Sequence, residues 1–206
     1  MKKLSLVVAA LVFSLYGFAQ PSITLLTFGG YAFADKFDIT YDYGYGYGKI
    51  QDGFQWGGGL EFGLSDEAAI ELIYQNMKTD AFVQGDILRY DGSLGINYVM
   101  LGGTRYAPVN EKVAGFGSLD LGVAWSSPDE SLNMESVTKF AWGGRLGVRI
   151  QGSDRVSVRL HAQLLSPVQW AGGGFYLGTG GSGVGLSTGS TVYQFSFGGS
   201  LNFKLR

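Results

Sequence analysis

The segment TVYQFSFGGSLNFKLR, residues 191–206, alternates between two kinds of side chain along its whole length. Every second position is apolar or glycine: Tyr193, Phe195, Phe197, Gly199, Leu201, Phe203 and Leu205. The positions between them are mostly small or neutral and polar: Gln194, Ser196, Gly198, Ser200, Asn202 and Lys204. Successive side chains of a β-strand point to opposite faces, so the pattern predicts a strand with one apolar face. The other face suits the inside of a narrow barrel, and we expect this strand to close a transmembrane β-barrel.

The composition of the 206-residue chain supports a single-domain membrane barrel. Charged residues make up only 16%, well under the usual quarter, while aromatic residues reach 15% and glycine occurs 34 times. The chain has no cysteine, which excludes disulfides, thiol catalysis and thiolate metal sites. The formal net charge of −2 gives no electrostatic case for a nucleic-acid partner. We predict no cofactor, no metal site and no nucleic-acid binding.

The first twenty residues, MKKLSLVVAALVFSLYGFAQ, have the three parts of a secretory signal peptide. Two lysines precede an apolar stretch from Leu4 to Phe18, and the small residues Gly17 and Ala19 suit cleavage before Gln20. The apolar stretch is shorter than the ~20 residues of a spanning helix. We therefore expect residues 1–19 to be removed and residues 20–206 to form an outer-membrane β-barrel.

The remaining sequence predicts an all-β fold, an eight-stranded antiparallel transmembrane β-barrel. The predicted strands are residues 22–34, 54–64, 68–77, 94–106, 113–125, 139–151, 155–165 and 191–206. Short turns at 65–67, 108–112 and 152–154 alternate with long connections at 35–53, 78–93, 126–138 and 166–190. Outer-membrane barrels have short periplasmic turns and longer extracellular loops. This alternation therefore predicts periplasmic termini and four extracellular loops.

The alternation within each strand assigns its two faces. In most strands apolar residues are predicted to face lipid and polar residues to face the interior. In strand 94–106 the same rule places Leu94, Ile96, Tyr98, Met100, Thr104 and Tyr106 outside, and Asn97 and Arg105 inside. The alternation of strand 22–34 is too weak to fix its outward face.

A soluble lipocalin-like barrel is the alternative, because it would place apolar residues inside and charges outside. Tryptophan favours the membrane barrel. The four tryptophans, Trp56, Trp125, Trp142 and Trp170, all fall at strand ends beside the long connections. Amphipathic rings at one level form the aromatic girdle of a membrane protein.

Three segments give the chain a resemblance to a known group: FGGYAFADKF (28–37), KVAGFGSLDLGVAW (112–125) and QFSFGGSLNFKL (194–205). With these glycine and aromatic patterns the chain resembles the small outer-membrane β-barrel superfamily of Gram-negative bacteria, the OmpX, OmpA-barrel and OmpW-like group. The resemblance covers the whole mature chain and implies an integral barrel of the bacterial outer membrane. Its motifs are specific for architecture and poor for function.

Eight titratable residues are predicted to lie inside: Glu61, Glu71, Arg105, Asp120, Arg145, Arg149, Arg159 and His161. Side chains fill the interior of an eight-stranded barrel, so we interpret these residues as a structural salt-bridge network. A charged pore is the alternative.

His161, the only histidine, raises the possibility of a lipid-modifying enzyme with a serine nucleophile. Gln163, however, stands two residues later, where the deacylase pattern His-x-Ser requires serine. The predicted extracellular contacts are four tyrosines that alternate with aspartate or glycine in the first long connection: Tyr41, Tyr43, Tyr45 and Tyr47. They suit either adaptable binding chemistry or a strand that extends above the membrane.

We expect a non-enzymatic structural or interaction barrel. Its predicted partners are outer-membrane lipid and other outer-membrane proteins, including a larger complex that it would serve as an accessory subunit. A narrow pore for small or apolar solutes is the alternative function, and a lipid-modifying barrel enzyme is the third.

Overall fold

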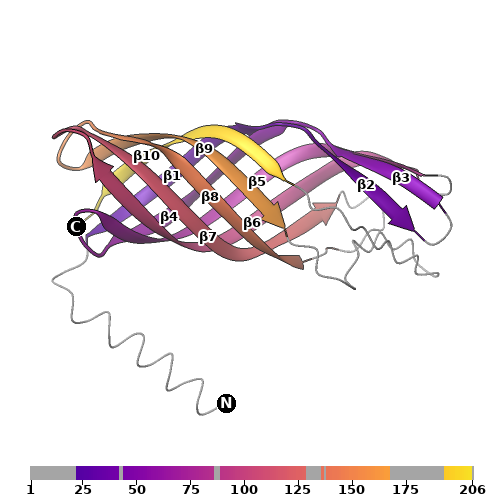
Figure 1. Cartoon of the computed structure of the whole chain (residues 1–206), viewed down its shortest axis with the longest axis horizontal. Helices are drawn as coiled ribbons and strands as arrows, with labels where there is room; N and C mark the ends of the chain where they lie inside the picture. Colours follow the sequence, from indigo (N-terminus) through magenta and orange to yellow (C-terminus); the bar gives the residue numbers. More distant parts are fainter. Residues whose placement is uncertain are drawn as a thin grey trace, which may run out of the picture.

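The computed structural model of the chain describes residues 22–41, 44–85, 89–128, 136, 138–167 and 193–205. These residues form the strands that Figure 1 labels: β1 (Ile23–Ala32), β2 (Asp35–Tyr41), β3 (Gly44–Ile50), β4 (Gly53–Gly63), β5 (Ala68–Gly85), β6 (Arg89–Pro108), β7 (Val113–Pro128), β8 (Thr138–Gln151), β9 (Val156–Pro167) and β10 (Gln194–Lys204). No helix among the described residues is long and apolar enough to span a bilayer.

Eight of these strands close into an antiparallel barrel. Around the barrel their order is β1, β4, β5, β6, β7, β8, β9 and β10, and β10 pairs back to β1. At this closure Thr24 lies opposite Lys204 and Ala32 lies opposite Ser196. The predicted eight-stranded barrel is confirmed, and its C-terminal segment is one of the two strands that close it.

The three predicted short turns lie at the same end of the barrel as the C-terminus (Figure 1). Each is held by a backbone hydrogen bond across its base: Leu64 N to Ala68 O (2.8 Å), Val109 N to Val113 O (2.9 Å) and Gly152 N to Val156 O (3.0 Å). We call this end the turn side and the opposite end the loop side.

Two of the four predicted long loops are largely strand, which corrects the sequence prediction. In segment 78–93, β5 continues to Gly85 and β6 begins at Arg89. In segment 35–53, β2 and β3 form a hairpin, and β3 pairs with the outer part of β5. Figure 1 shows this hairpin projecting beyond the barrel on the loop side. The other two predicted loops, 126–138 and 166–190, lie mostly outside the described residues.

The outer wall carries the apolar residues predicted for β4, β5 and β7 to β10. Large exposed side chains include Phe54, Trp56, Leu72, Leu119, Leu121, Phe140, Leu146, Leu160, Phe197 and Leu201. A contiguous apolar surface of this extent is rare on a soluble monomer, because water solvates it poorly. The wall is therefore built to contact lipid.

The predicted faces of β6 are wrong. The interior holds Ile96, Tyr98, Met100, Thr104 and Tyr106, all of them buried, while Val99 and Leu101 are exposed on the outer wall. Both faces of this strand carry large apolar residues, so its own alternation does not identify the lipid side. The neighbouring strands identify it instead. Gly102 lies opposite Asp120, and a Cβ at Gly102 would overlap the Asp120 carboxylate. The face of β6 that contains Gly102 is therefore the one that leaves room for the interior carboxylates.

β1, whose faces the sequence left open, also turns apolar residues inward. Leu26, Phe28 and Ala32 are buried, whereas Leu25 and Tyr31 are exposed. The interior is therefore apolar in part, which the small polar face of β10 did not indicate.

Candidate functional site

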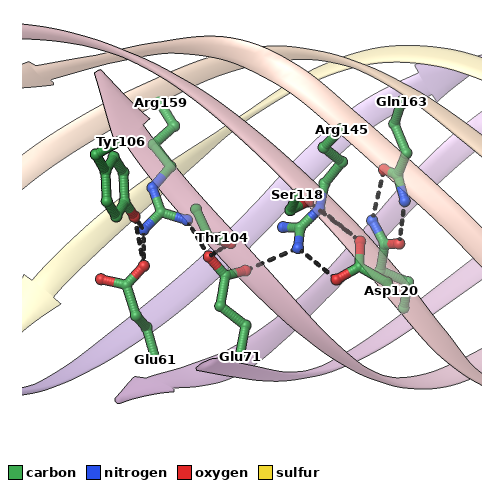
Figure 2. A network of polar contacts seen from close by, with 10 residues as sticks. Glu61, Glu71, Thr104, Tyr106, Ser118, Asp120, Arg145, Arg159 and Gln163 are labelled. Carbon is green, nitrogen blue, oxygen red and sulfur yellow. Dashed lines mark hydrogen bonds and ion pairs between the residues drawn. The ribbon is translucent and has the colours of Figure 1, made fainter. Parts of the chain in front are cut away.

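A cluster of charged side chains crosses the inside of the barrel in its turn-side half (Figure 2). Glu71 is at its centre: its carboxylate accepts from Arg145 Nη2 at 2.7 Å and from Arg159 Nη1 at 2.8 Å. The Thr104 hydroxyl donates to the same carboxylate at 2.6 Å. The side chains of Glu71, Arg145 and Arg159 are each at most 1% exposed. The cluster is therefore a buried ion-pair network.

Each arginine binds a second carboxylate at its own end of the network. Arg145 donates to Asp120 Oδ1 at 3.0 Å, and Ser118 donates to the same carboxylate at 3.2 Å. Arg159 pairs with Glu61 and also contacts the Tyr106 hydroxyl. Two arginines thus serve three carboxylates, which is the pairing that buried charges require.

The network ties opposite walls of the barrel together. Glu61 and Glu71 are on β4 and β5, while Arg145 and Arg159 are on β8 and β9, so that bonded partners are three or four strands apart around the barrel. The pairing register sets the heights, because it places Glu61 opposite Glu71 on neighbouring strands. The network therefore fixes the cross-section of the barrel as well as neutralising its charges.

Neutral polar pairs continue these cross-links toward the loop side. The amides of Gln75 and Gln163 exchange two hydrogen bonds, at 2.7 and 3.1 Å, between β5 and β9. The Tyr98 hydroxyl donates to Gln194 at 3.3 Å between β6 and β10. A buried apolar cluster begins on the turn side of these pairs and continues past them toward the loop side; it includes Leu26, Ile73, Met100, Met77, Ile96 and Leu165.

The turn-side mouth is open by comparison. A polar cavity of about 520 Å³ lies below the network, and Glu61, Tyr106, Arg149 and Ser157 are among the residues that line it. The Arg149 guanidinium stacks over the Tyr106 ring at 4.0 Å. Water can therefore reach the network from this end.

Arg105 lies outside the barrel, contrary to its prediction as an interior charge. Its side chain is 77% exposed, and its contact with Glu67 is 3.7 Å long. The inversion of β6 explains the error, because Arg105 is on the same face as Val99 and Leu101. Asn97, also predicted inside, has outward neighbours as well: Tyr74 and Asn76 donate to its amide oxygen at 2.9 and 2.8 Å.

The same inversion brings two residues into the network that sequence reasoning missed, Thr104 and Tyr106. The signal that could have found them is Gly102, a small residue between two predicted interior carboxylates. The register places Glu71 and Asp120 on either side of it.

His161 lies inside the barrel without a serine partner among the described residues. Its ring meets Phe28 and Phe116 edge-on, with centroids 6.4 Å away in both cases, and its Nδ1 is buried with no hydrogen bond. Ser118 donates to Asp120, and Ser157 accepts from Asn202. Nor do the described residues include a cluster of three or more side chains that could hold a metal ion.

Three of the predicted girdle tryptophans are on the outer wall, and Trp170 lies outside the described residues. Tyr74 lies between two of them, with ring centroids 6.2 Å from Trp56 and 6.3 Å from Trp125. Trp142 is half-buried on the outward face of β8.

The tyrosine repeat belongs to the β2–β3 hairpin by its backbone. Tyr41 ends β2, while Tyr45 and Tyr47 are in β3. Tyr43 is outside the described residues. The backbone of this segment is thus the strand extension that the sequence left as one of two alternatives.

Known proteins match this chain in structure but not in sequence. No family model and no curated protein matches it. Neisserial surface protein A is similar in structure, with a TM-score of 0.61 and 11% identity over 89% of this chain and 97% of that one. The outer membrane protein OprG from Pseudomonas aeruginosa also has a TM-score of 0.61 and 11% identity, over 91% of this chain and 98% of that one. The chain therefore has the fold of the small eight-stranded β-barrels that are integral to bacterial outer membranes.

Proposed function

We propose that this chain is a non-enzymatic structural or interaction barrel of the outer membrane that conducts no solute along its axis. The observation that carries the proposal is the filled interior. The ion-pair network around Glu71 blocks the turn-side half, and the apolar cluster around Met100 blocks the loop-side half. An eight-stranded barrel has no room left for a channel once such side chains are in place.

The β2–β3 hairpin is the element that we assign to contact with partners. β2 is at the end of the strand order, and within the described residues no strand pairs with its outer edge. An open edge offers unpaired backbone groups to a strand of another chain. With the turn side in the periplasm, this edge faces the cell exterior. Service as an accessory subunit of a larger outer-membrane complex is one form of this role.

The pore alternative has little support from the loop-side mouth. The apolar pocket there, lined by Ile50, Leu94, Ile96 and Tyr98 among others, measures about 40 Å³. A pocket of this size has room for only a few water molecules, which argues against a path for a larger solute. The enzyme alternative loses support because the His161 ring packs against two aromatic rings and its Nδ1 makes no hydrogen bond to a serine within the described chain.

The test begins with gentle detergent extraction from native membranes, followed by native mass analysis. We expect a species heavier than one barrel. A matched variant replaces residues 38–47 by Asn-Gly, which closes the hairpin with a tight turn and leaves the eight barrel strands intact. This variant should be extracted as a single folded barrel. A lone wild-type barrel that conducts ions in a planar bilayer would overturn the proposal in favour of the pore.

A further inference from the structure

A groove of about 550 Å³ crosses the outer wall over β6, β7, β8 and β9. Its floor consists of small residues that face outward: Gly103, Gly117, Gly144 and Ala162. The Leu119 side chain stands between two of these glycines, because the register pairs Leu119 with both Gly103 and Gly144. A Cβ at Gly103 would have no neighbour within 4 Å, which shows how open the floor is. We call this feature the wall groove.

The lining of the wall groove is almost entirely apolar, so its occupant must be apolar as well. The groove lies within the lipid-facing belt, where the alternative to an occupant is a void beside the leucine side chains. A void forfeits the dispersion contacts of the atoms that line it. A hydrocarbon chain is the matching occupant that the surrounding bilayer supplies.

The wall groove is shorter than the hydrocarbon thickness of one lipid leaflet. It runs from Arg105, close to the turn at residues 109–112, toward Trp142 and Phe195. Along β8 the distance from Leu146 to Trp142 is about 13 Å at the rise of a strand. At the ~40° tilt of barrel strands this is about 10 Å along the bilayer normal. One leaflet occupies half of the ~30 Å hydrocarbon core. A single acyl chain that enters from the turn side would therefore lie in the groove over about two-thirds of the thickness of one leaflet.

Arg105 gives the wall groove a charged end. Its side chain is 77% exposed on a face that is otherwise apolar, and a long arginine stem reaches the headgroup level from there. Glu67 approaches only its Nη2, at 3.7 Å, which is long for a charge-assisted hydrogen bond. The planar guanidinium fork matches the oxygens of a phosphate. The groove thus combines a hydrocarbon slot with a phosphate-binding group at headgroup depth.

We propose that the wall groove is a lipid-binding site that holds one acyl chain of a glycerophospholipid from the turn-side leaflet, with its phosphate on Arg105. The bound acyl chain fills the groove and so completes the apolar outer surface of the barrel. This proposal goes beyond the structural or interaction role, because it assigns a ligand class to a site on the wall.

The test uses the full mature chain, folded in detergent, and native mass spectrometry with added phosphatidylglycerol. Gly103→Leu fills the groove floor, and its Cβ has no neighbouring atom within 4 Å. Gly29→Leu is the matched control, because Gly29 also faces outward but is on β1, where only the Phe54 ring lies within 4 Å of a Cβ. Arg105→Gln removes the charge at an exposed position whose contact with Glu67 is 3.7 Å long. Thermal unfolding of each variant verifies the fold.

We expect one phosphatidylglycerol bound to the wild type and to Gly29→Leu, and about a fivefold weaker adduct with Gly103→Leu. Arg105→Gln should weaken phosphatidylglycerol binding and leave binding of a diacylglycerol, which has no phosphate, unchanged. Equal lipid retention by Gly103→Leu and Gly29→Leu would overturn the site. Loss of a second copy of the chain, rather than of lipid, on Gly103→Leu would assign the groove to a protein contact instead. Equal weakening of both lipids by Arg105→Gln would overturn the phosphate contact.

Discussion

Replacing Arg145 by methionine should destabilise the barrel far more than the same change at Arg149. Both arginines are on β8, and both point into the barrel. Arg145 is buried and donates to two carboxylates, Glu71 at 2.7 Å and Asp120 at 3.0 Å. Arg149 lines the open turn-side cavity and stacks on Tyr106. Methionine keeps much of the apolar stem in each case and removes only the cation.

The two losses differ in what they leave behind. Without Arg145, Glu71 still has Arg159 and Thr104, but Asp120 keeps only Ser118 as a hydrogen-bond partner among the described contacts. Removing one partner from a buried ion pair costs ~3–5 kcal/mol, because a charge stays buried without its counter-ion. Without Arg149 the loss is one cation–π contact at a wet site, about 0.5–1 kcal/mol.

The measurement is the free energy of unfolding by denaturant, followed by tryptophan fluorescence of the barrel in lipid vesicles. Single-channel recording of the same variants in planar bilayers gives the conductance. Asp120→Asn in the Arg145→Met background should recover stability, because it neutralises the orphaned carboxylate. Neighbours in one network typically show coupling of ~0.5–3 kcal/mol.

Two results would refute this reasoning. The first is an Arg145→Met variant as stable as Arg149→Met, which would mean that water or another cation replaces the arginine. The second is a new or lost conductance in Arg145→Met without any loss of stability, which is the behaviour of a charged pore.

Three further predictions concern the wall and the leader. Gly147→Ala should lower stability by ~1–3 kcal/mol in the same denaturant assay, because its Cβ would overlap the Leu160 carbonyl oxygen, whereas Gly103→Ala should be neutral. Cysteine at Leu101 should react with a lipid-soluble maleimide in folded vesicles, and cysteine at Met100 should stay protected, because the two residues face opposite sides of β6. N-terminal sequencing of the protein from the outer membrane should begin at Gln20, and a start at residue 1 would contradict the signal peptide.

The sequence alone was sufficient for the eight-stranded barrel, its three turns and the faces of six strands. These features follow from local alternation, because strands such as β9 and β10 place apolar residues on the lipid side and polar residues on the interior side. It was insufficient for the β2–β3 hairpin and the outer half of β5. Glycine, tyrosine and charged residues make up most of those segments, and their strand pairing depends on register with a neighbour rather than on burial of one face. The network members on β4, β5, β7, β8 and β9 were predicted because each of these strands has one clearly apolar face and carries its charged residues on the other.

The error on β6 has a physical cause that extends to the whole interior. Alternation identifies the lipid face only where the inside is polar, and the loop-side part of this interior mixes polar pairs such as Gln75–Gln163 with apolar side chains. Where Met100 and Tyr98 join the apolar cluster, both faces of β6 are apolar, so the alternation does not show which face contacts lipid. What decides the face is the network: Glu71 and Asp120 need an empty interior position between them, and Gly102 supplies it. Gly102→Ala should therefore push the two carboxylates off Arg145 and lose ~1–3 kcal/mol in the denaturant assay, and a neutral result would mean that the network does not hold β6 in place.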